Sequence, residues 1–287
     1  MSRYKLRANY DIENIDSQKM DGTVIVDVPM LSNGELNYGL SHIKKKLYEE
    51  NVYPSEIGFD IMSLATMVYM ADTRIERVVH GQDSWTREIE LEIPVSNVEI
   101  WDSQIRTVER MLKFLTGDLW KITLSSRAWQ FNNLEEVREK SNKYDEVSLF
   151  SGGMDSLIST INLMENKKNT LLISHAGEGL TKNAQKNIVN KFDLLYPDVL
   201  HTWLDLWMVF PRDYIPAGGN DNNTRSRSFL FIGYALFAMT GMDNINELLV
   251  PENGLIALNV PLDETRVGSF STRTTHPFYL SLWNELL

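Results

Sequence analysis

The sequence predicts an α/β protein, with a doubly wound parallel sheet in residues 143–287 and an N-terminal α+β domain in residues 1–142. Two observations support this prediction. From Asp145 onward, strand-like and helix-like segments alternate, which is the order that builds a parallel sheet covered by helices. Before that point the order is irregular, and the charged run EEVREKSNKYDE separates the two parts. We expect the N-terminal domain to bind a partner or a substrate.

The composition limits the classes of function. The 28 basic and 39 acidic residues give a net charge of −11, which disfavours nucleic acid as a direct partner because sequence-independent binding needs a basic face. No stretch is long and apolar enough for a membrane-spanning helix, and the first 16 residues contain no apolar signal region. The absence of cysteine excludes disulfides, a cysteine nucleophile and a cysteine-ligated zinc ion, so we expect no zinc site.

The N-terminal elements follow from the spacing of apolar residues. Expected are strands at 3–10, 22–30, 88–93 and 118–124 and helices at 36–53, 57–71 and 105–116. Pro94 is expected to end the third of these strands. Asp102 or Ser103 is expected to cap the last helix, and Gly117 to end it as its C′ residue. The run Lys44-Lys45-Lys46 is expected to be a solvated helix face. Five polar or aromatic residues are expected in surface pairs, with a binding role as the alternative: Asp72, Arg74, Arg77, Trp85 and Arg87.

The C-terminal elements alternate. Expected are strands at 145–150, 170–174, 199–206 and 248–250 and helices after 156, at 181–195, at 229–239 and from Pro277. The composition of residues 211–224, rich in Pro, Gly and Asn, predicts a loop or lid. His175 directly follows the second of these strands, at the carboxyl edge where such sheets bind ligands, so we expect it in the cofactor site.

The segment Ser151-Gly152-Gly153-Met154-Asp155-Ser156 lies between a predicted strand and a predicted helix. The two glycines permit positive φ and let ligand oxygens approach the backbone closely. The start of the following helix favours an anion, because its N–H groups are free and its dipole is positive there. The segment therefore predicts a phosphate cradle, in which Asp155 is available to hold Mg²⁺. The alternative is a plain strand-to-helix turn capped by Ser156.

Arg225 and Arg227 stand where the apolar helix at 229–239 begins. A helix that is apolar all round is expected to be buried, so its first turn would project the two arginines toward a ligand. Arginine at this end opposes the helix dipole and favours a compensating anion. We therefore expect both arginines to bind phosphate, with a solvated first turn as the alternative.

The S-G-G-x-D-S pattern resembles the PP-loop of the ATP pyrophosphatase superfamily, whose fold is adenine nucleotide α-hydrolase-like. Together with R-S-R-S-F-L-F at 225–231, E-N-G at 252–254 and S-T-R-T-T-H-P at 271–277, it is similar to the QueC, or 7-cyano-7-deazaguanine synthase, family. The motifs A-D-T-R at 71–74 and L-T-G-D-L-W at 115–120 resemble the extended QueC-like proteins of bacterial anti-phage operons, the QatC type in particular.

This resemblance implies an ATP-dependent C–N bond-forming ligase. Such an enzyme adenylates a 7-carboxy-7-deazaguanine-type carboxylate, releases pyrophosphate and transfers the acyl group to ammonia or to an amine of a partner protein from the same operon. ATP and Mg²⁺ are the implied cofactors, and use of ATP predicts the cytoplasm. Alternatives that stay open are another PP-loop amidating or tRNA-modifying enzyme and a non-catalytic nucleotide-binding scaffold subunit.

The resemblance also implies a set of site residues. The catalytic group is Asp155, Arg227 and His276; the ATP and Mg²⁺ group is Ser151, Gly152, Gly153, Asp155, Ser156, His175, Arg225 and Arg227; the substrate group is Glu252, Asn253, Arg266, Arg273 and Thr275. His276 is expected to act as a base or to bind phosphate, with a structural role as the alternative. The sequence departs from QueC in lacking its cysteine cluster, and its end at Leu287, inside an expected helix, is taken as a C-terminal truncation of such a domain or as a partly ordered end.

Overall fold

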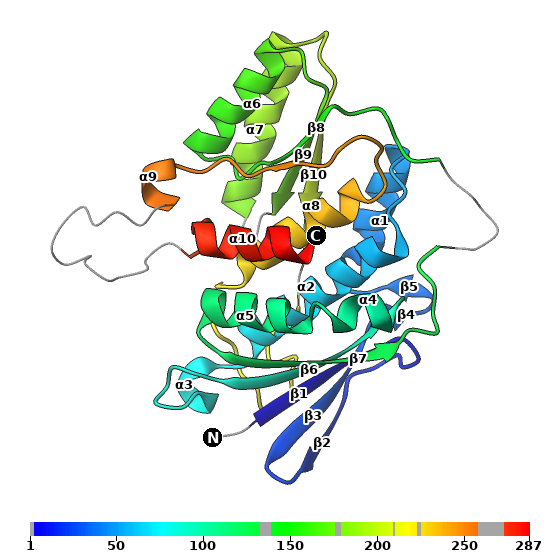
Figure 1. Cartoon of the computed structure of the whole chain (residues 1–287), viewed down its shortest axis with the longest axis vertical. Coiled ribbons are helices and arrows are strands. Elements are labelled where there is room, and N and C mark those ends of the chain that lie inside the picture. The colour runs from blue at the N-terminus through cyan, green and yellow to red at the C-terminus, as the bar shows by residue number, and fades with distance from the viewer. Residues whose placement is uncertain (1–2, 133–138, 176–178, 209, 223–224, 258–272) are drawn as a thin grey trace, which may run out of the picture.

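The structure, a computed structural model, describes residues 3–132, 139–175, 179–208, 210–222, 225–257 and 273–287, without the side chains of residues 255 and 256. It contains two stacked tiers, each built on its own sheet, with helices between them (Figure 1). A small hairpin of β4 (Leu31–Ser32) and β5 (Glu35–Leu36) adds a third pairing. The chain is therefore an α/β protein, as the sequence predicts.

The first tier is a five-stranded sheet of order β2-β3-β1-β6-β7. Its strands are β1 (Arg3–Asn9), β2 (Asp16–Met20), β3 (Thr23–Pro29), β6 (Glu88–Val95) and β7 (Leu119–Ser126). All pairings are parallel except that of β2 with β3. Alternate residues of β6 are buried, as the apolar and acidic alternation over 88–93 predicts.

The second tier is a four-stranded, fully parallel sheet of order β10-β9-β8-β11. Its strands are β8 (Glu146–Leu149), β9 (Thr170–His175), β10 (His201–Leu206) and β11 (Leu248–Leu249). Helices α6 (Met154–Glu165) and α7 (Gly179–Leu195) pack around Leu172 on one face, and α8 (Arg227–Met239) packs on the other. Helices cover both faces of β9, so all six of its residues are buried, the polar Thr170, Ser174 and His175 included.

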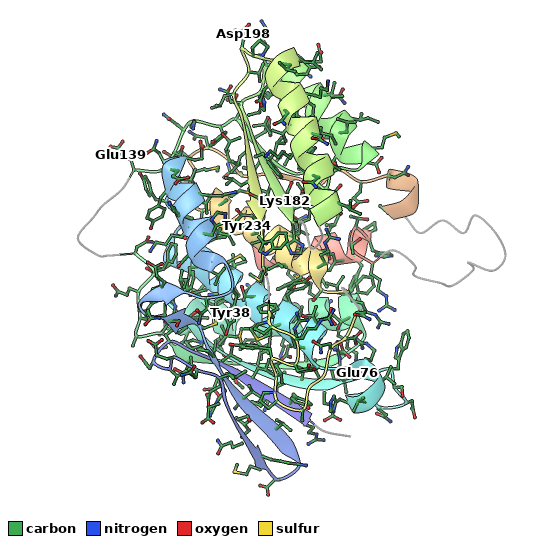
Figure 2. All side chains as sticks on the ribbon, turned by 180° about the vertical axis from the view of Figure 1, so that it is seen from behind. Tyr38, Glu76, Glu139, Lys182, Asp198 and Tyr234 are labelled. Atoms are coloured by element: carbon green, nitrogen blue, oxygen red, sulfur yellow. The ribbon has the colours of Figure 1, made fainter. Side chains whose placement is uncertain are left out.

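Helices join the two tiers into one hydrophobic core (Figure 1). The remaining helices are α1 (Leu40–Glu49), α2 (Glu56–Arg74), α3 (Arg77–His80), α4 (Val98–Asp102), α5 (Ile105–Thr116), α9 (Gly254–Ala257) and α10 (Pro277–Leu286). The α2 and α8 helices make the most extensive helix–helix contact, and Tyr234 of α8 is fully buried near the centre of the molecule (Figure 2). The burial of α8 confirms the prediction made from its apolar circumference.

The α2–α8 contact depends on two glycines. A Cβ atom on Gly233 would lie 2.9 Å from Cβ of Ala65, and one on Gly58 would lie 2.2 Å from Oγ1 of Thr240. Both distances are shorter than side chains allow, so the helices are as close here as their backbones permit.

Gly233→Val is therefore expected to push α8 away from α2 and to lower the free energy of unfolding by about 1–3 kcal/mol. Urea denaturation would measure the loss. Gly179→Ala, at the start of α7, is the control, because a Cβ there meets nothing within 4 Å. Equal stability of Gly233→Val and the wild type would contradict the close packing.

Several details differ from the sequence prediction. The helix expected at 36–53 covers only Leu40–Glu49, and residue 36 belongs to β5. The strand β2 was not predicted, because all five of its residues are exposed and polar residues dominate it. Pro94 does not end β6: beyond Glu92 the strand pairs only with β7, so proline lies at a local sheet edge where its missing N–H is tolerated. The residue before α5 is Gln104, whose side chain makes no cap, whereas Gly117 ends this helix with φ 80° as predicted.

Candidate functional site

The predicted phosphate cradle lies at the topological switch point of the second sheet. From β8 the chain proceeds through β9 to β10 on one side, whereas β11 lies on the other side of β8. The carboxyl ends of β8 and β11 therefore border a crevice, which is where open α/β sheets bind ligands. Residues 151–153 follow β8, and Glu252 follows β11 at the same edge.

The turn from β8 to α6 is held by its own hydroxyl groups. Gly152 adopts φ 81° and donates its N–H to Oγ of Ser156 at 3.1 Å, and the N–H of Gly153 donates to Oγ of Ser151 at 3.2 Å. The two hydroxyl oxygens are 3.1 Å apart. Gln185 of α7 supports the turn from behind by donating to the carbonyl of Ser151 at 3.0 Å. The serines thus shape the turn.

The first turn of α6 presents N–H groups that no side chain caps, since Gly153 stands at the N-cap position. Helix starts of this kind attract anions. A Cβ at Gly152 would lie 2.9 Å from Cγ of Gln185 and would require positive φ, so glycine is needed at this position. The backbone of the turn therefore fits a phosphate group.

Glu252 lies close enough to Asp155 to be affected by its negative charge. Asp155 is exposed in the first turn of α6, and Glu252 follows the short strand β11. Burial, and then the charge of Asp155, raises the pKa of Glu252. Two neighbouring carboxylates beside a phosphate cradle would suit Mg²⁺, which prefers oxygen ligands. Among the described residues, no group of three or more His, Cys, Asp or Glu side chains forms a metal site by itself.

A small cavity of about 60 Å³ lies beside the turn. It is lined by serines of the turn and of α8, by apolar residues, by Glu252 and by the threonines at 274 and 275. The buried hydroxyl group of Thr275 has no hydrogen-bond partner among the described residues, whereas that of Ser228 lies beside the Tyr279 hydroxyl. Because an unpartnered buried hydroxyl costs free energy, the cavity is suited to a polar ligand atom or a water molecule. Thr275 is thus near the turn, as its predicted substrate role requires.

His175 and Arg227 contact each other at the end of β9. Arg227 donates from Nε to Nδ1 of His175 at 3.2 Å and from Nη2 to its carbonyl oxygen at 2.8 Å. The imidazole is therefore an acceptor at Nδ1, which requires the neutral form with the proton on Nε2. Burial, and then the charge of Arg227, lowers the pKa of His175 to about 4. His175 orients Arg227, which reaches solvent at the sheet edge.

This contact predicts a pH dependence of stability. The unfolded chain protonates His175 near its ordinary pKa of 6.5, whereas the folded chain does so near 4, so the unfolded state binds more protons between these values. Stability is thus lost as the pH falls from 6.5 toward 4, by about 2 kcal/mol at pH 5. In His175→Gln, the difference between urea unfolding at pH 7.5 and pH 5 should shrink by that amount. His42→Gln, an exposed control, should behave like the wild type.

Five other predicted site residues lie away from the turn, make other contacts or fall outside the described residues. Arg225 donates from Nη1 to the carbonyl of Thr116 at 2.7 Å, and Arg273 donates to the carbonyl of Phe114 at 3.1 Å, so both guanidinium groups lie at the end of α5. His276 caps α10, because its Nδ1 accepts the N–H of Phe278 at 3.1 Å. Asn253 is exposed beside Glu252, and Arg266 lies outside the described residues.

A buried ion network is the main feature that the sequence prediction missed. Asp72, Arg77 and Arg87 were expected at the surface, but their side chains are at most 6% exposed and Asp118 joins them. Asp118 accepts from Nη1 and Nη2 of Arg77 at 2.5 and 2.9 Å and from Nη2 of Arg87 at 2.7 Å. Asp72 accepts the N–H of Ser226 at 2.8 Å, which ties the start of α8 to this network. The signal in the sequence was a carboxylate inside a mostly apolar helix: α2 contains Asp72 and a second buried carboxylate, Asp60.

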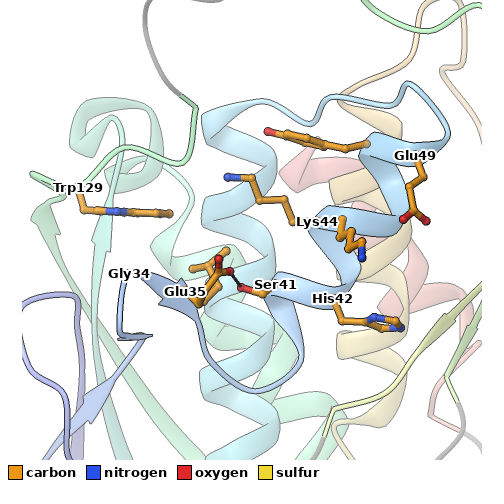
Figure 3. Close-up of a pocket in the computed structure, with 10 residues that line it drawn as sticks. Gly34, Glu35, Ser41, His42, Lys44, Glu49 and Trp129 are labelled. Carbon is orange, nitrogen blue, oxygen red and sulfur yellow. Dashed lines mark hydrogen bonds between the residues drawn. The ribbon is translucent and has the colours of Figure 1, made fainter.

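The predicted solvated lysine run is only partly exposed. Lys45 is exposed, but Lys46 pairs with the buried Asp205, and Lys44 donates to the carbonyl of Phe131 at 3.2 Å. This face of α1 lines an open cavity of about 710 Å³ whose far wall is Trp129 (Figure 3). Within it, Ser41 donates to Glu35 at 2.6 Å. The cavity carries charges of both signs and is separate from the turn at 151–156.

Comparison with family models, with curated proteins and with solved structures finds no match for this chain. Among the described residues, no helix has the length and apolar character needed to cross a membrane.

Proposed function

We propose that the chain is a QueC-like, ATP-dependent C–N bond-forming ligase. It adenylates a carboxylate of the 7-carboxy-7-deazaguanine type, releases pyrophosphate and transfers the acyl group to an amine. The observation that carries this proposal is the Ser-Gly-Gly-Met-Asp-Ser turn at the switch point of a parallel sheet, with an uncapped helix start behind it. A Walker-type kinase is disfavoured because no Gly-Lys-Ser/Thr follows the glycines.

The turn would hold the phosphates of ATP. The N–H groups that open α6 would donate to phosphate oxygens, and Arg227, oriented by His175, would add a bidentate donor at the same sheet edge. Asp155 and Glu252 would hold Mg²⁺, whose charge would offset that of the pyrophosphate group. This assigns Glu252 to the metal as well as to the substrate side of the site.

The reaction balances without a covalent enzyme intermediate. The substrate carboxylate oxygen bonds to the α-phosphorus while the bond to pyrophosphate breaks. An amine then bonds to the acyl carbon, AMP leaves, and the amine loses one proton. The donors of the turn and Arg227 stabilise the negative charge that develops on the leaving group. Proton acceptance by His276 stays a prediction, since the described contact of its Nδ1 serves to cap α10.

The acceptor amine and the biological setting rest on the resemblance to QueC-like proteins of anti-phage operons. By that resemblance, the acceptor is ammonia or an amine of a partner protein. The acidic net charge of −11 agrees with a protein or small-molecule acceptor better than with tRNA.

Mass spectrometry of the purified chain with Mg-ATP and 7-carboxy-7-deazaguanine, with and without ammonium, tests the proposal. AMP and pyrophosphate should form only when the deazaguanine is present, and an amide or nitrile should follow when ammonium is added. Formation of ADP, or of AMP with no dependence on the carboxylate, would overturn it. ATP binding without any turnover, even with the operon's partner protein added, would favour the scaffold alternative.

A further inference from the structure

Helix α2 of the first tier lies against the pair formed by His175 and Arg227. The ring of Tyr69 in α2 is edge-on to that of His175, with ring centres 5.6 Å apart and an angle of 86° between the planes. Asp72, three residues later, accepts the N–H of Ser226 at 2.8 Å, and Ser226 directly precedes Arg227. Because residues three apart share one face of a helix, a single face of α2 contacts His175 and the start of α8.

The negative charge at the start of α8 comes from α2. Helix α8 has no acidic residue in its first turn, and among the described residues the side chain of Ser226, its N-cap residue, makes no capping hydrogen bond. The Asp72 carboxylate is 0% exposed and lies where the helix dipole is positive. Arg227, the first residue of α8, opposes that dipole, so Asp72 offsets an unfavourable charge at the same helix end.

The carboxylate of Asp72 is itself fixed by buried arginines. Its Oδ1 accepts from Nη2 of Arg87 at 2.6 Å and from Nη2 of Arg77 at 3.5 Å, whereas Oδ2 accepts the N–H of Ser226. The side chains of both arginines are at most 6% exposed. The buried network therefore sets the direction of Oδ2, and Oδ2 in turn fixes the backbone from which Arg227 extends.

We propose that Asp72 is a positioning residue for Arg227, and that the first tier thereby forms part of the phosphate site of the second. With Ser226 held in place, the Arg227 side chain starts from a fixed point, and its guanidinium reaches Nδ1 and the carbonyl oxygen of His175. This inference rests on the proposed role of Arg227 in binding ATP. Helix α2, which the sequence assigns to a separate N-terminal domain, would then act on the ATP site without touching ATP.

Asp72→Asn separates the two functions of the carboxylate. Both oxygens of Asp72 accept from donors, so the amide must turn its NH₂ group toward either the arginines or the N–H of Ser226. The charged guanidinium groups bind the amide oxygen more strongly than one backbone N–H does, so the NH₂ group faces Ser226 and that contact is lost. The variant thus frees the start of α8 while it retains a partner for Arg87.

The first measurement needs no ligand and follows the imidazole proton of His175 at pH 7.5. Nδ1 accepts from Arg227, which keeps the proton on Nε2, because the hydrogen bond of one ring nitrogen decides which nitrogen carries the proton. Two-bond ¹H–¹⁵N NMR, with the signal assigned by its loss in His175→Gln, should show this single tautomer in the wild type. Asp72→Asn and Arg227→Met should both show a mixture of the two tautomers, and the double variant should resemble Arg227→Met.

The second measurement is the affinity for Mg-ATP by isothermal titration calorimetry. Asp72→Asn should weaken binding about tenfold, because the contact of Arg227 is partly lost, and should cause no further loss when combined with Arg227→Met. The matched control is Asp60→Asn, at the other buried carboxylate of α2, which should lose stability but keep the wild-type tautomer and affinity. The partners of Asp60 belong to the first tier and are Ser96, Trp101 and Arg127.

Three results would overturn the positioning role: a single His175 tautomer in Asp72→Asn, additive losses of affinity in the double variant, or equal effects of Asp60→Asn and Asp72→Asn. If the wild type does not bind Mg-ATP, the proposed function fails, and the His175 tautomer still decides whether Asp72 positions Arg227. If Asp72→Asn does not fold, Ser226→Pro takes its place, because proline lacks the N–H and suits the φ of −82° at this position. The same mixture of tautomers is then expected.

Discussion

Asp155→Asn is expected to abolish formation of AMP and pyrophosphate while leaving the fold intact. Asp155 is exposed in the first turn of α6, so the substitution removes a charge without disturbing the core. If it holds Mg²⁺ together with Glu252, its loss removes much of the metal affinity and of the charge stabilisation of the leaving group. We expect a decrease in rate of about 10²–10³-fold. Pyrophosphate release at saturating ATP, measured over a range of Mg²⁺ concentrations, would show it.

Two comparisons make this result specific. Asp198→Asn, at the exposed tip of the second tier, removes the same charge far from the turn and should retain full activity (Figure 2). High Mg²⁺ should recover part of the lost rate, since Glu252 and the phosphates would remain as ligands. If Asp155→Asn instead keeps its full activity, the turn is not the ATP site. If the wild type itself has no activity but Asp155→Asn supports defence in cells, the scaffold alternative holds.

Asp118→Asn is expected to cause the largest loss of stability. Asp118 is fully buried and accepts hydrogen bonds from both Arg77 and Arg87. The amide would leave two buried guanidinium groups without their shared carboxylate, and removal of one partner of a buried ion pair costs about 3–5 kcal/mol. Whole domains are stable by only about 5–15 kcal/mol, so a large decrease in thermal midpoint should follow. Differential scanning calorimetry would measure it.

The same carboxylate predicts an acid dependence. Burial alone would raise the pKa of Asp118, but the hydrogen bonds and charges of Arg87 and Arg77 outweigh burial and lower it. A carboxyl whose pKa is lowered by folding stabilises the protein above its ordinary pKa, and this contribution is lost as the pH falls below that value. Asp118→Asn should therefore reduce the loss of stability in acid. Asp102→Asn, exposed at the end of α4, should match the wild type; a similar loss in both variants would contradict the buried network.

Local patterns in the sequence were sufficient to predict most of the secondary structure. The alternation of apolar and acidic residues predicted β6. The helical spacing of apolar residues predicted α5, and Gly117 predicted where this helix ends. The apolar circumference of α8 predicted its burial. The turn at 151–156 was predicted as a strand-to-helix connection, and the structure places it at the switch point of the sheet. These features depend on near neighbours in the chain, for which residue type and spacing contain the information.

Only the tertiary structure decided which distant side chains meet. Arg225 and Arg227 are two residues apart and had the same predicted role, yet one lies over Trp85 at the end of α5 and the other on His175 at the end of β9. Asp72 and Asp118 are both buried because packing brings α2 and the residue before β7 to the same two arginines, one of which, Arg87, pairs with both carboxylates. The charge of a residue is known from the sequence. Its partner, and hence its pKa and its chemistry, depends on contacts between segments that packing brings together.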